Sequence, residues 1–186
     1  MKLIINNEKD MKKFYKLLPL YKSFLFNKIY FELAVDNNSL EKIFKALNIK
    51  NKKARLEYIY DEACVILDKQ FQGINVCGFI NNKCLTQHNC HKTNGCCRKC
   101  VYQSSRGCTT KNLTCKLFYC GEVTKKYNPL KFEDLNILKL LNIRQKIILK
   151  HDYFSSREEV LKDLEIGSLI IFTIRLSYRY LTKNIV

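Results

Sequence analysis

Cysteines are the residues whose number and spacing in this chain point most directly to chemistry. Nine of the ten lie between Cys77 and Cys120, together with two of the three histidines. This cysteine window contains no Asp or Glu, because the acidic residues stop at Asp68 and resume at Glu122. Packing alone does not require so many thiols, so the window predicts a metal site or a disulfide framework.

Eight of these cysteines are the expected metal ligands: Cys84, Cys90, Cys96, Cys97, Cys100, Cys108, Cys115 and Cys120. Cys97 and Cys100 form a C-x2-C pair, a spacing that lets two thiolates reach one metal from a tight turn. The side chain of Cys96 diverges from its neighbour, so it serves either a second metal or none. Eight thiolates suit two four-coordinate centres.

The ligand chemistry narrows the type of metal. Soft thiolates select mainly zinc, iron–sulfur clusters or copper(I). The common zinc pattern has two C-x2-C pairs, whereas this chain has one clear pair, and the ferredoxin run C-x2-C-x2-C-x3-C-P is absent. Because thiols are dense and acids are absent, we favour an iron–sulfur cluster of the 4Fe–4S type, with zinc as the alternative. Cys77, His88 and His91 are further candidates, although a histidine in a polar loop is more often an exposed residue.

The run GCCRKC at 95–100, followed by GCTTKNLTCKLFYC at 107–120, resembles the YkgJ-type cysteine-cluster family of zinc- or iron-chelating proteins. That family includes branches regarded as iron–sulfur proteins, among them flagellin lysine methylases. The positions that match its pattern are Cys96, Cys97, Cys100, Cys108 and Cys115. The Arg-Pro that usually precedes the later cysteine is missing here. The resemblance implies metal binding rather than a particular reaction.

The formal charge of +16 suggests a second function, binding to nucleic acid. However, the joint richness in Lys, Asn and Ile is what AT-rich coding sequence imposes on any surface. Two thiolate centres of about −2 each would also remove roughly a quarter of the excess. Basic residues of the window would then offset the clusters: Lys83, Lys92, Arg98, Lys99, Arg106, Lys111 and Lys116. We therefore rank a zinc-stapled nucleic-acid-binding module below the iron–sulfur protein.

The expected compartment also bears on the thiols. The N-terminal apolar run Leu3–Ile5 is followed by charges, which is not a signal peptide. The longest apolar stretch, Leu169–Leu181, is interrupted by Arg175 and Arg179, so no membrane span is expected. These features predict a cytoplasmic protein, in which thiols stay reduced and bind metal. A secreted disulfide scaffold, suggested by the even cysteine count, would need a signal peptide.

Helical patterns precede the window. Residues 11–18 have helical spacing that Pro19 should end, and the apolar stretch Leu20–Val35 follows. A further helix, capped by Asn38 or Ser39, has an apolar stripe: Leu40, Ile43, Phe44 and Leu47.

A fourth helix, from about Lys52 to Asp68, has its own apolar stripe: Leu56, Tyr60, Ala63 and Leu67. Cys64 flanks that stripe, where the simplest role is a small buried hydrophobe. From residue 71 to 121 the periodicity disappears, so this segment needs something other than packing to hold it.

Helical patterns return after the window. A segment that opens at Asn128-Pro129 has apolar residues at helical spacing: Phe132, Leu135, Leu138, Ile143, Ile147 and Ile148. Next comes a capping-box pattern, in which Ser155 or Ser156 pairs with Glu158 or Glu159. Strict alternation from Phe172 to Tyr180 predicts a terminal strand, with residues 2–5 and 74–80 as the available partners.

The sequence thus predicts a mainly α fold, in which helical N- and C-terminal thirds pack together around an irregular cysteine-rich metal-binding segment, with a small β element. The regions are 1–70, 71–121 and 122–186, integrated into one domain. The expected function is metal binding with a redox, sensing or cluster-dependent enzymatic role. A redox or protein partner would fit that role, and no catalytic residue stands out.

Overall fold

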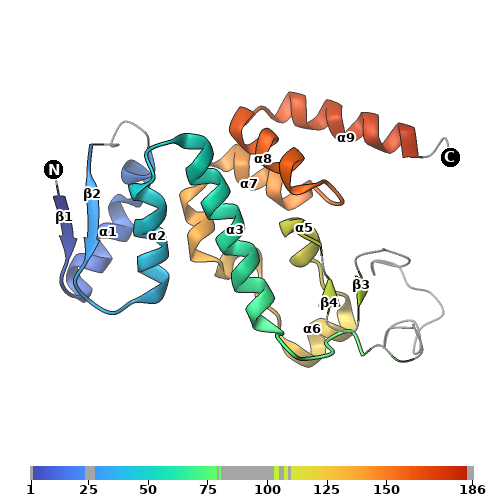
Figure 1. The fold of residues 1–186 in the computed structure, drawn as a ribbon, viewed down its shortest axis with the longest axis horizontal. Helices are drawn as coiled ribbons and strands as arrows, with labels where there is room; N and C mark the ends of the chain where they lie inside the picture. The colour runs from blue at the N-terminus through green and yellow to red at the C-terminus, as the bar shows by residue number, and fades with distance from the viewer. Residues whose placement is uncertain are drawn as a thin grey trace.

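The fold is mainly helical, as the sequence predicts, and Figure 1 shows how the helices are arranged. The computed structural model describes residues 2–23, 28–78, 80, 103–104, 107–108 and 110–183. Helices of the N-terminal third pack on helices of the C-terminal third, and a small parallel sheet closes one end of the molecule. Within these ranges, no helix combines the length and the apolar character that crossing a bilayer requires.

The N-terminal sheet consists of β1 (Lys2–Ile5) and β2 (Tyr30–Leu33), which pair in parallel. A parallel pair needs a crossover connection, which α1 (Glu8–Tyr21) supplies. Residues 2–5 are a strand as expected, but β2 lies in a stretch for which a helix was expected. The reason is the period-two pattern of β2, where Phe31 is buried and its two neighbours are exposed.

Helix α1 continues past Pro19, where the sequence pattern placed its end. A proline so close to the end of a helix removes a single N–H from the last turn. The chain still closes that turn, because the N–H of Lys22 reaches the carbonyl oxygen of Leu18 at 3.0 Å. The predicted end was therefore wrong by one turn or less.

Helices α2 (Asn38–Asn48) and α3 (Lys52–Gln70) confirm the two apolar stripes, since every stripe residue is buried. Their N-caps are Asn37 and Asn51, whose side chains accept backbone N–H groups of the first turn. For α2 the cap thus lies one residue before the pair expected from the sequence.

The remaining elements lie within the cysteine window and after it. In chain order the remaining elements are β3 (Gln103–Ser104), β4 (Gly107–Cys108), α5 (Leu113–Lys116), α6 (Gly121–Tyr127), η2 (Phe132–Asp134), η3 (Asn136–Leu140), α7 (Ile143–His151), α8 (Arg157–Ile166) and α9 (Leu169–Lys183). The segment after Pro129 thus forms two 3-10 helices before α7. The predicted capping box is confirmed at the start of α8, where Ser156 and Glu159 exchange hydrogen bonds of 2.8 and 3.2 Å.

The C-terminal segment is helix α9, and the predicted terminal strand is wrong. Residues 2–5, one of the partners expected for that strand, pair instead with β2. Of the alternating apolar residues only Phe172 is buried, while polar Arg175 faces inward and binds Asp152 and Asp163. Large apolar side chains on α9 remain exposed: Ile170, Ile171, Ile174, Tyr178, Tyr180 and Leu181.

Helix α7 also differs from its predicted apolar face. Ile148 is fully buried, but Ile143 is 78% exposed and Ile147 is 38% exposed. The buried face of the helix instead consists of Gln145, Ile148 and Leu149. Gln145 can enter the core because its amide donates to the carbonyl oxygen of Leu164 at 3.0 Å.

One hydrophobic core joins the two helical thirds, and α3 crosses its centre (Figure 1). α3 packs against α2, α5, α8 and η3. The core includes Leu56 and Ile59 of α3, Leu138 of η3 and Leu164 of α8. Each fully buried aliphatic side chain contributes about 1.5–3 kcal/mol, so this core fixes the frame around the window.

Candidate metal centre

The expected ligands divide into those that the structure describes and those that it does not. Outside the described residues lie Cys84, Cys90, Cys96, Cys97 and Cys100, as do His88 and His91. Cys108 is in β4, whose backbone pairs antiparallel with Gln103 of β3. Cys77, Cys115 and Cys120 are described with their side chains, as is Cys64. The structure thus defines the edges of the window.

The two edges of the window, which we define as residues 71–78 and 113–127, are joined by aromatic contacts. The ring of Phe71, which follows α3, lies edge-on to Tyr119 at 5.6 Å and to Tyr127 at 5.9 Å between ring centroids. The side-chain oxygen of Gln70 also accepts the N–H of Leu130 at 3.2 Å. The chain therefore leaves for the window and returns from it at the same end of the molecule.

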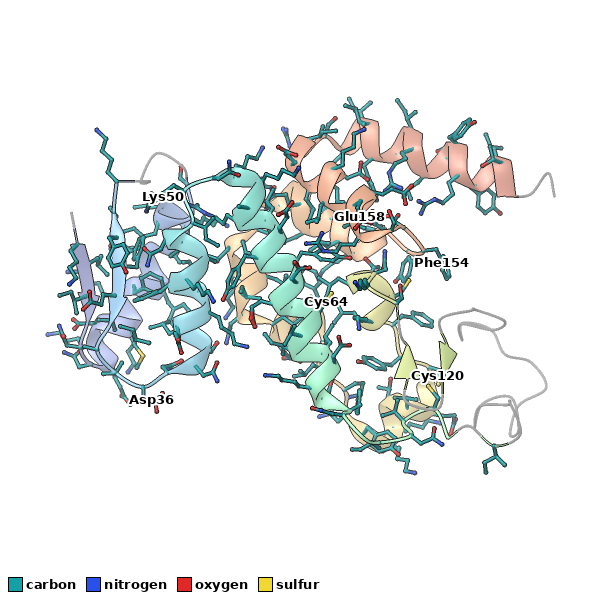
Figure 2. The ribbon with its side chains drawn as sticks, viewed as in Figure 1. Asp36, Lys50, Cys64, Cys120, Phe154 and Glu158 are labelled. Carbon is teal, nitrogen blue, oxygen red and sulfur yellow. The ribbon has the colours of Figure 1, made fainter. Side chains whose placement is uncertain are left out.

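Cys120 sits at this junction, directly before α6. Figure 2 shows it well apart from Cys64 on α3. Its carbonyl oxygen accepts both the N–H and the hydroxyl of Thr124, at 3.0 and 3.1 Å, which starts the helix. The Cys120 side chain does not cap α6 and is half-buried.

Cys115 is placed by the short helix α5 and is buried. Asn112 caps α5 by accepting the N–H of Cys115 at 2.8 Å. Its side-chain amide donates to the carbonyl oxygens of Asp152 and Ser155 at 2.7 and 3.1 Å, which ties α5 to the α7–α8 turn. The Cys115 sulfur accepts the N–H of Phe154 from that turn at 3.3 Å.

Cys64 lies outside the window and is a free thiol on α3. Its sulfur is 3.8 Å from the carbonyl oxygen of Lys111. Burial raises the pKa of the Cys64 thiol to about 12, with Lys116 acting in the opposite direction and Asp68 in the same one. Cys64 is therefore protonated at neutral pH, in agreement with its expected role as a packing residue.

Tyr60 joins the same segment to α3. Its hydroxyl donates to the carbonyl oxygen of Lys111 and accepts the N–H of Leu113, both at 2.9 Å. Burial, the largest effect, raises the pKa of Tyr60 well above its ordinary value, against the hydrogen bond from Leu113. The neutral hydroxyl thus serves as both donor and acceptor.

Lys116, one of the basic residues expected to offset a metal cluster, is 8% exposed, and its ammonium pairs with the carboxylate of Asp68, which is 59% exposed. This pair compensates the charge of a mostly buried lysine. The expected role of Lys116 beside a metal cluster stays a prediction.

The described residues do not assemble a metal site by themselves. Within residues 2–23, 28–78, 80 and 110–182, whose side chains the structure describes, no three His, Cys, Asp or Glu side chains are grouped so that they could hold a metal ion. The eight-cysteine ligand set remains a prediction.

Comparison with family models, curated proteins and solved structures gives no significant match to this chain. The resemblance to the YkgJ-type family thus rests on the cysteine spacing alone.

The hydrogen-bonding centre at Asn112 is the part of the site that sequence patterns did not identify. The available signal was Asn112 before Leu113, an N-cap residue directly before an apolar one. It was missed because the whole of residues 71–121 was interpreted as irregular.

Proposed function

We propose that this chain is a metal-binding protein that holds one or two iron–sulfur clusters and has a redox, sensing or cluster-dependent enzymatic role. The observation that carries the proposal is the concentration of nine cysteines in a window without a single acidic residue. The proposed ligands are Cys84, Cys90, Cys96, Cys97, Cys100, Cys108, Cys115 and Cys120.

The anchoring of the window edges supports this proposal. Phe71 on one edge contacts Tyr119 and Tyr127 on the other, so the intervening chain forms a closed loop. A loop of this length without apolar periodicity has little to gain from packing. Metal–thiolate bonds supply the missing free energy, because ligand binding to a folded segment is itself folding free energy.

The arginines favour a metal protein over a nucleic-acid-binding module. Four of them bind oxygens of their own chain: Arg55, Arg157, Arg175 and Arg179. The guanidinium fork is the preferred ligand for phosphates and for guanine edges. Within the described ranges, only Arg144 forms no hydrogen bond to an oxygen of the chain. The basic groups left available at the surface of these ranges are therefore mainly lysines.

Anaerobic purification followed by iron, sulfide and zinc analysis tests the proposal. We expect iron and acid-labile sulfide in stoichiometric amounts, with broad absorption at about 400 nm from thiolate–iron charge transfer. A colourless protein with stoichiometric zinc would contradict it. Binding to DNA and RNA at low salt would then be measured, because counterion release favours it most there.

Two cysteine variants make the test specific to the window. Cys97→Ser removes one member of the C-x2-C pair, and we expect it to lose most of the bound iron. Cys64→Ser is the matched control, since Cys64 is a protonated thiol outside the window, and it should keep the iron content of the parent chain. Equal iron contents in the two variants would rule out Cys97 as a ligand.

A further inference from the structure

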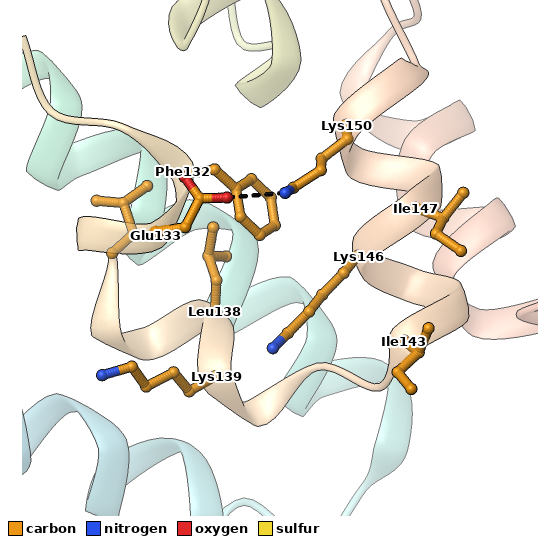
Figure 3. A pocket seen from close by; sticks show the side chains of 9 residues that line it. Phe132, Glu133, Leu138, Lys139, Ile143, Lys146, Ile147 and Lys150 are labelled. Carbon is orange, nitrogen blue, oxygen red and sulfur yellow. Dashed lines mark hydrogen bonds and ion pairs between the residues drawn. The ribbon is translucent and has the colours of Figure 1, made fainter.

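A second candidate site lies away from the cysteine window, in a pocket formed by η2, η3 and α7 (Figure 3). Its volume is about 350 Å³. Sites for small molecules have volumes of about 300–1,000 Å³ and mostly apolar walls. The walls here are mainly apolar as well: Phe132, Leu135, Leu138, Ile143 and Ile147. This pocket also explains why Ile143 and Ile147 of α7 are not covered by the core.

Three lysines line the same pocket, and two of them have partners. Lys150 binds the carboxylate of Glu133 at 2.8 Å and lies 4.8 Å from the centre of the Phe132 ring. Lys139 donates to the side-chain oxygen of Asn136 at 2.6 Å. These two cations are thus held at the rim of the pocket.

Lys146 is the third lysine and differs from the other two. Among the described residues, no hydrogen bond or ion pair is formed by its ammonium group. Figure 3 shows its side chain extending from α7 across the pocket, between Leu138 and Ile143. Lys146 is half-buried, so an anion that entered the pocket would meet an ammonium group with no competing partner among the described residues.

A further positive charge, that of Lys22, interacts with Lys146. Lys22, at the end of α1, donates to the carbonyl oxygens of Leu141 and Lys139 at 3.1 and 3.4 Å. Burial, followed by the charge of Lys146, lowers the pKa of Lys22. Glu133 is the one acid that lines the pocket, and Lys150 already binds it. The positive charge around Lys146 is therefore uncompensated.

We propose that this pocket binds a small carboxylate with an aliphatic body. The carboxylate pairs with Lys146, and the aliphatic chain lies against Leu138, Ile143 and Ile147. A phosphate fits less well, because the walls are apolar and no arginine lines the pocket. The N-terminus of α7 does not favour a phosphate either, because Asn142 and Gln145 already cap that helix end.

Titration of the full-length chain with octanoate, followed by methyl NMR and calorimetry, tests the proposal. We expect saturable binding with a dissociation constant of about 1 mM or tighter, which requires only a modest contribution per ligand atom. Shifts should be largest at Ile143 and Ile147. Octanol lacks the charge and acetate lacks the chain, so each should bind at least about tenfold more weakly.

Variants at Lys146 test the role of the charge. Lys146→Gln should weaken octanoate binding about tenfold, whereas Lys146→Arg should retain it. The control is Lys125→Gln on α6, a lysine that is 79% exposed and outside the pocket, and it should bind like the parent chain. The proposal is overturned if octanoate does not bind, if octanol binds equally well, or if Lys146→Gln binds like Lys125→Gln.

Discussion

Asn112 shows how much of this structure depends on single polar residues. Its side chain is 1% exposed and makes three hydrogen bonds, one to cap α5 and two to the α7–α8 turn. The backbone of Asn112 is fixed in turn by the hydroxyl of Thr110, which accepts its N–H at 3.1 Å. One amide therefore positions both Cys115 and the turn that donates to the Cys115 sulfur.

We expect Asn112→Ala to lower the free energy of unfolding by about 3 kcal/mol. About 1 kcal/mol comes from the lost helix cap, and the remainder from two buried carbonyl groups left without a donor. Urea denaturation measures the change. Asn7→Ala, at the exposed N-cap of α1, is the control and should lose only about 1 kcal/mol. Equal losses in the two variants would show that the bonds to Asp152 and Ser155 contribute nothing.

Glu159 gives a pH-dependent prediction at the same scale. Burial disfavours its charge, but the N–H of Ser156 and the guanidinium of Arg179 outweigh burial and hold the pKa of Glu159 below its ordinary value of 4.5. A lowered pKa stabilises the fold above pH 4.5, and this contribution disappears as the pH falls through the folded-state pKa.

Glu159→Gln should therefore be less stable than the parent chain by about 0.5–1 kcal/mol at neutral pH. The value is small because the Glu159 side chain is 45% exposed and solvent screens its charge. Glutamine keeps the capping box, so only the charge is removed. Urea titrations from neutral pH to below pH 4.5 should show the difference shrinking, whereas a difference independent of pH would contradict the role of the charge.

At the scale of elements, sequence patterns succeeded where one face of a helix meets the core. The apolar stripes of α2 and α3 are continuous and buried, so the helical spacing of apolar residues in the sequence matches the buried face in the structure. The sequence pattern was misleading for α9, because the side of this helix that faces the rest of the protein is partly polar. Its apolar side chains alternate along the sequence, but the residues that anchor it are Phe172, Arg175 and Arg179. The acids that bind these arginines, buried Asp152 and Asp163 and half-exposed Glu159, precede α9 in the chain, and no local pattern reveals them.

Docking of α9 depends on Arg175, which binds two buried carboxylates. The side chains of Asp152 and Asp163 are 0% and 4% exposed. Arg175→Met keeps the length of the side chain but leaves both acids without a cation, and we expect a loss of about 3 kcal/mol or more. Hydrogen exchange should then accelerate throughout α9.

The matched control is Arg157→Met. Arg157 also forms a two-bond pair with a carboxylate, at 2.6 and 2.7 Å to Asp61, but the acid is 49% exposed. The expected loss is about 0.5–1 kcal/mol. If both variants lost the same stability, burial of the acids would not explain the attachment of α9.

For the molecule as a whole, the frame around the cysteine window was harder to predict than the position of the window in the sequence. The cysteine spacing identifies the window without any structure, since thiols are rare enough to be informative. The meeting of its two edges depends on Phe71, Tyr119 and Tyr127, which are ordinary aromatic residues in sequence. The core that fixes these edges joins residues more than 100 positions apart, such as Leu56 and Leu164. Such pairings follow from three-dimensional packing rather than from any local period.

This arrangement predicts that metal removal affects one end of the molecule. The window edges lie at the end opposite β1 and β2, with α3 between them (Figure 1). Oxidation and chelation of the purified protein should therefore accelerate amide exchange in residues 71–78 and 113–127, because the closed loop loses its ligand bonds there. Exchange in β2 and α2 should stay slow, since the core holds these elements independently of the window.

Hydrogen exchange with mass spectrometry measures both regions in one sample, which makes the comparison internal. Cys97→Ser, treated in the same way, is the control, and it should show fast exchange at the window edges before and after chelation. Uniform acceleration along the whole chain would mean that the metal stabilises the entire core. No change at residues 71–78 and 113–127 would mean that the aromatic contacts of Phe71 hold the edges without any help from metal.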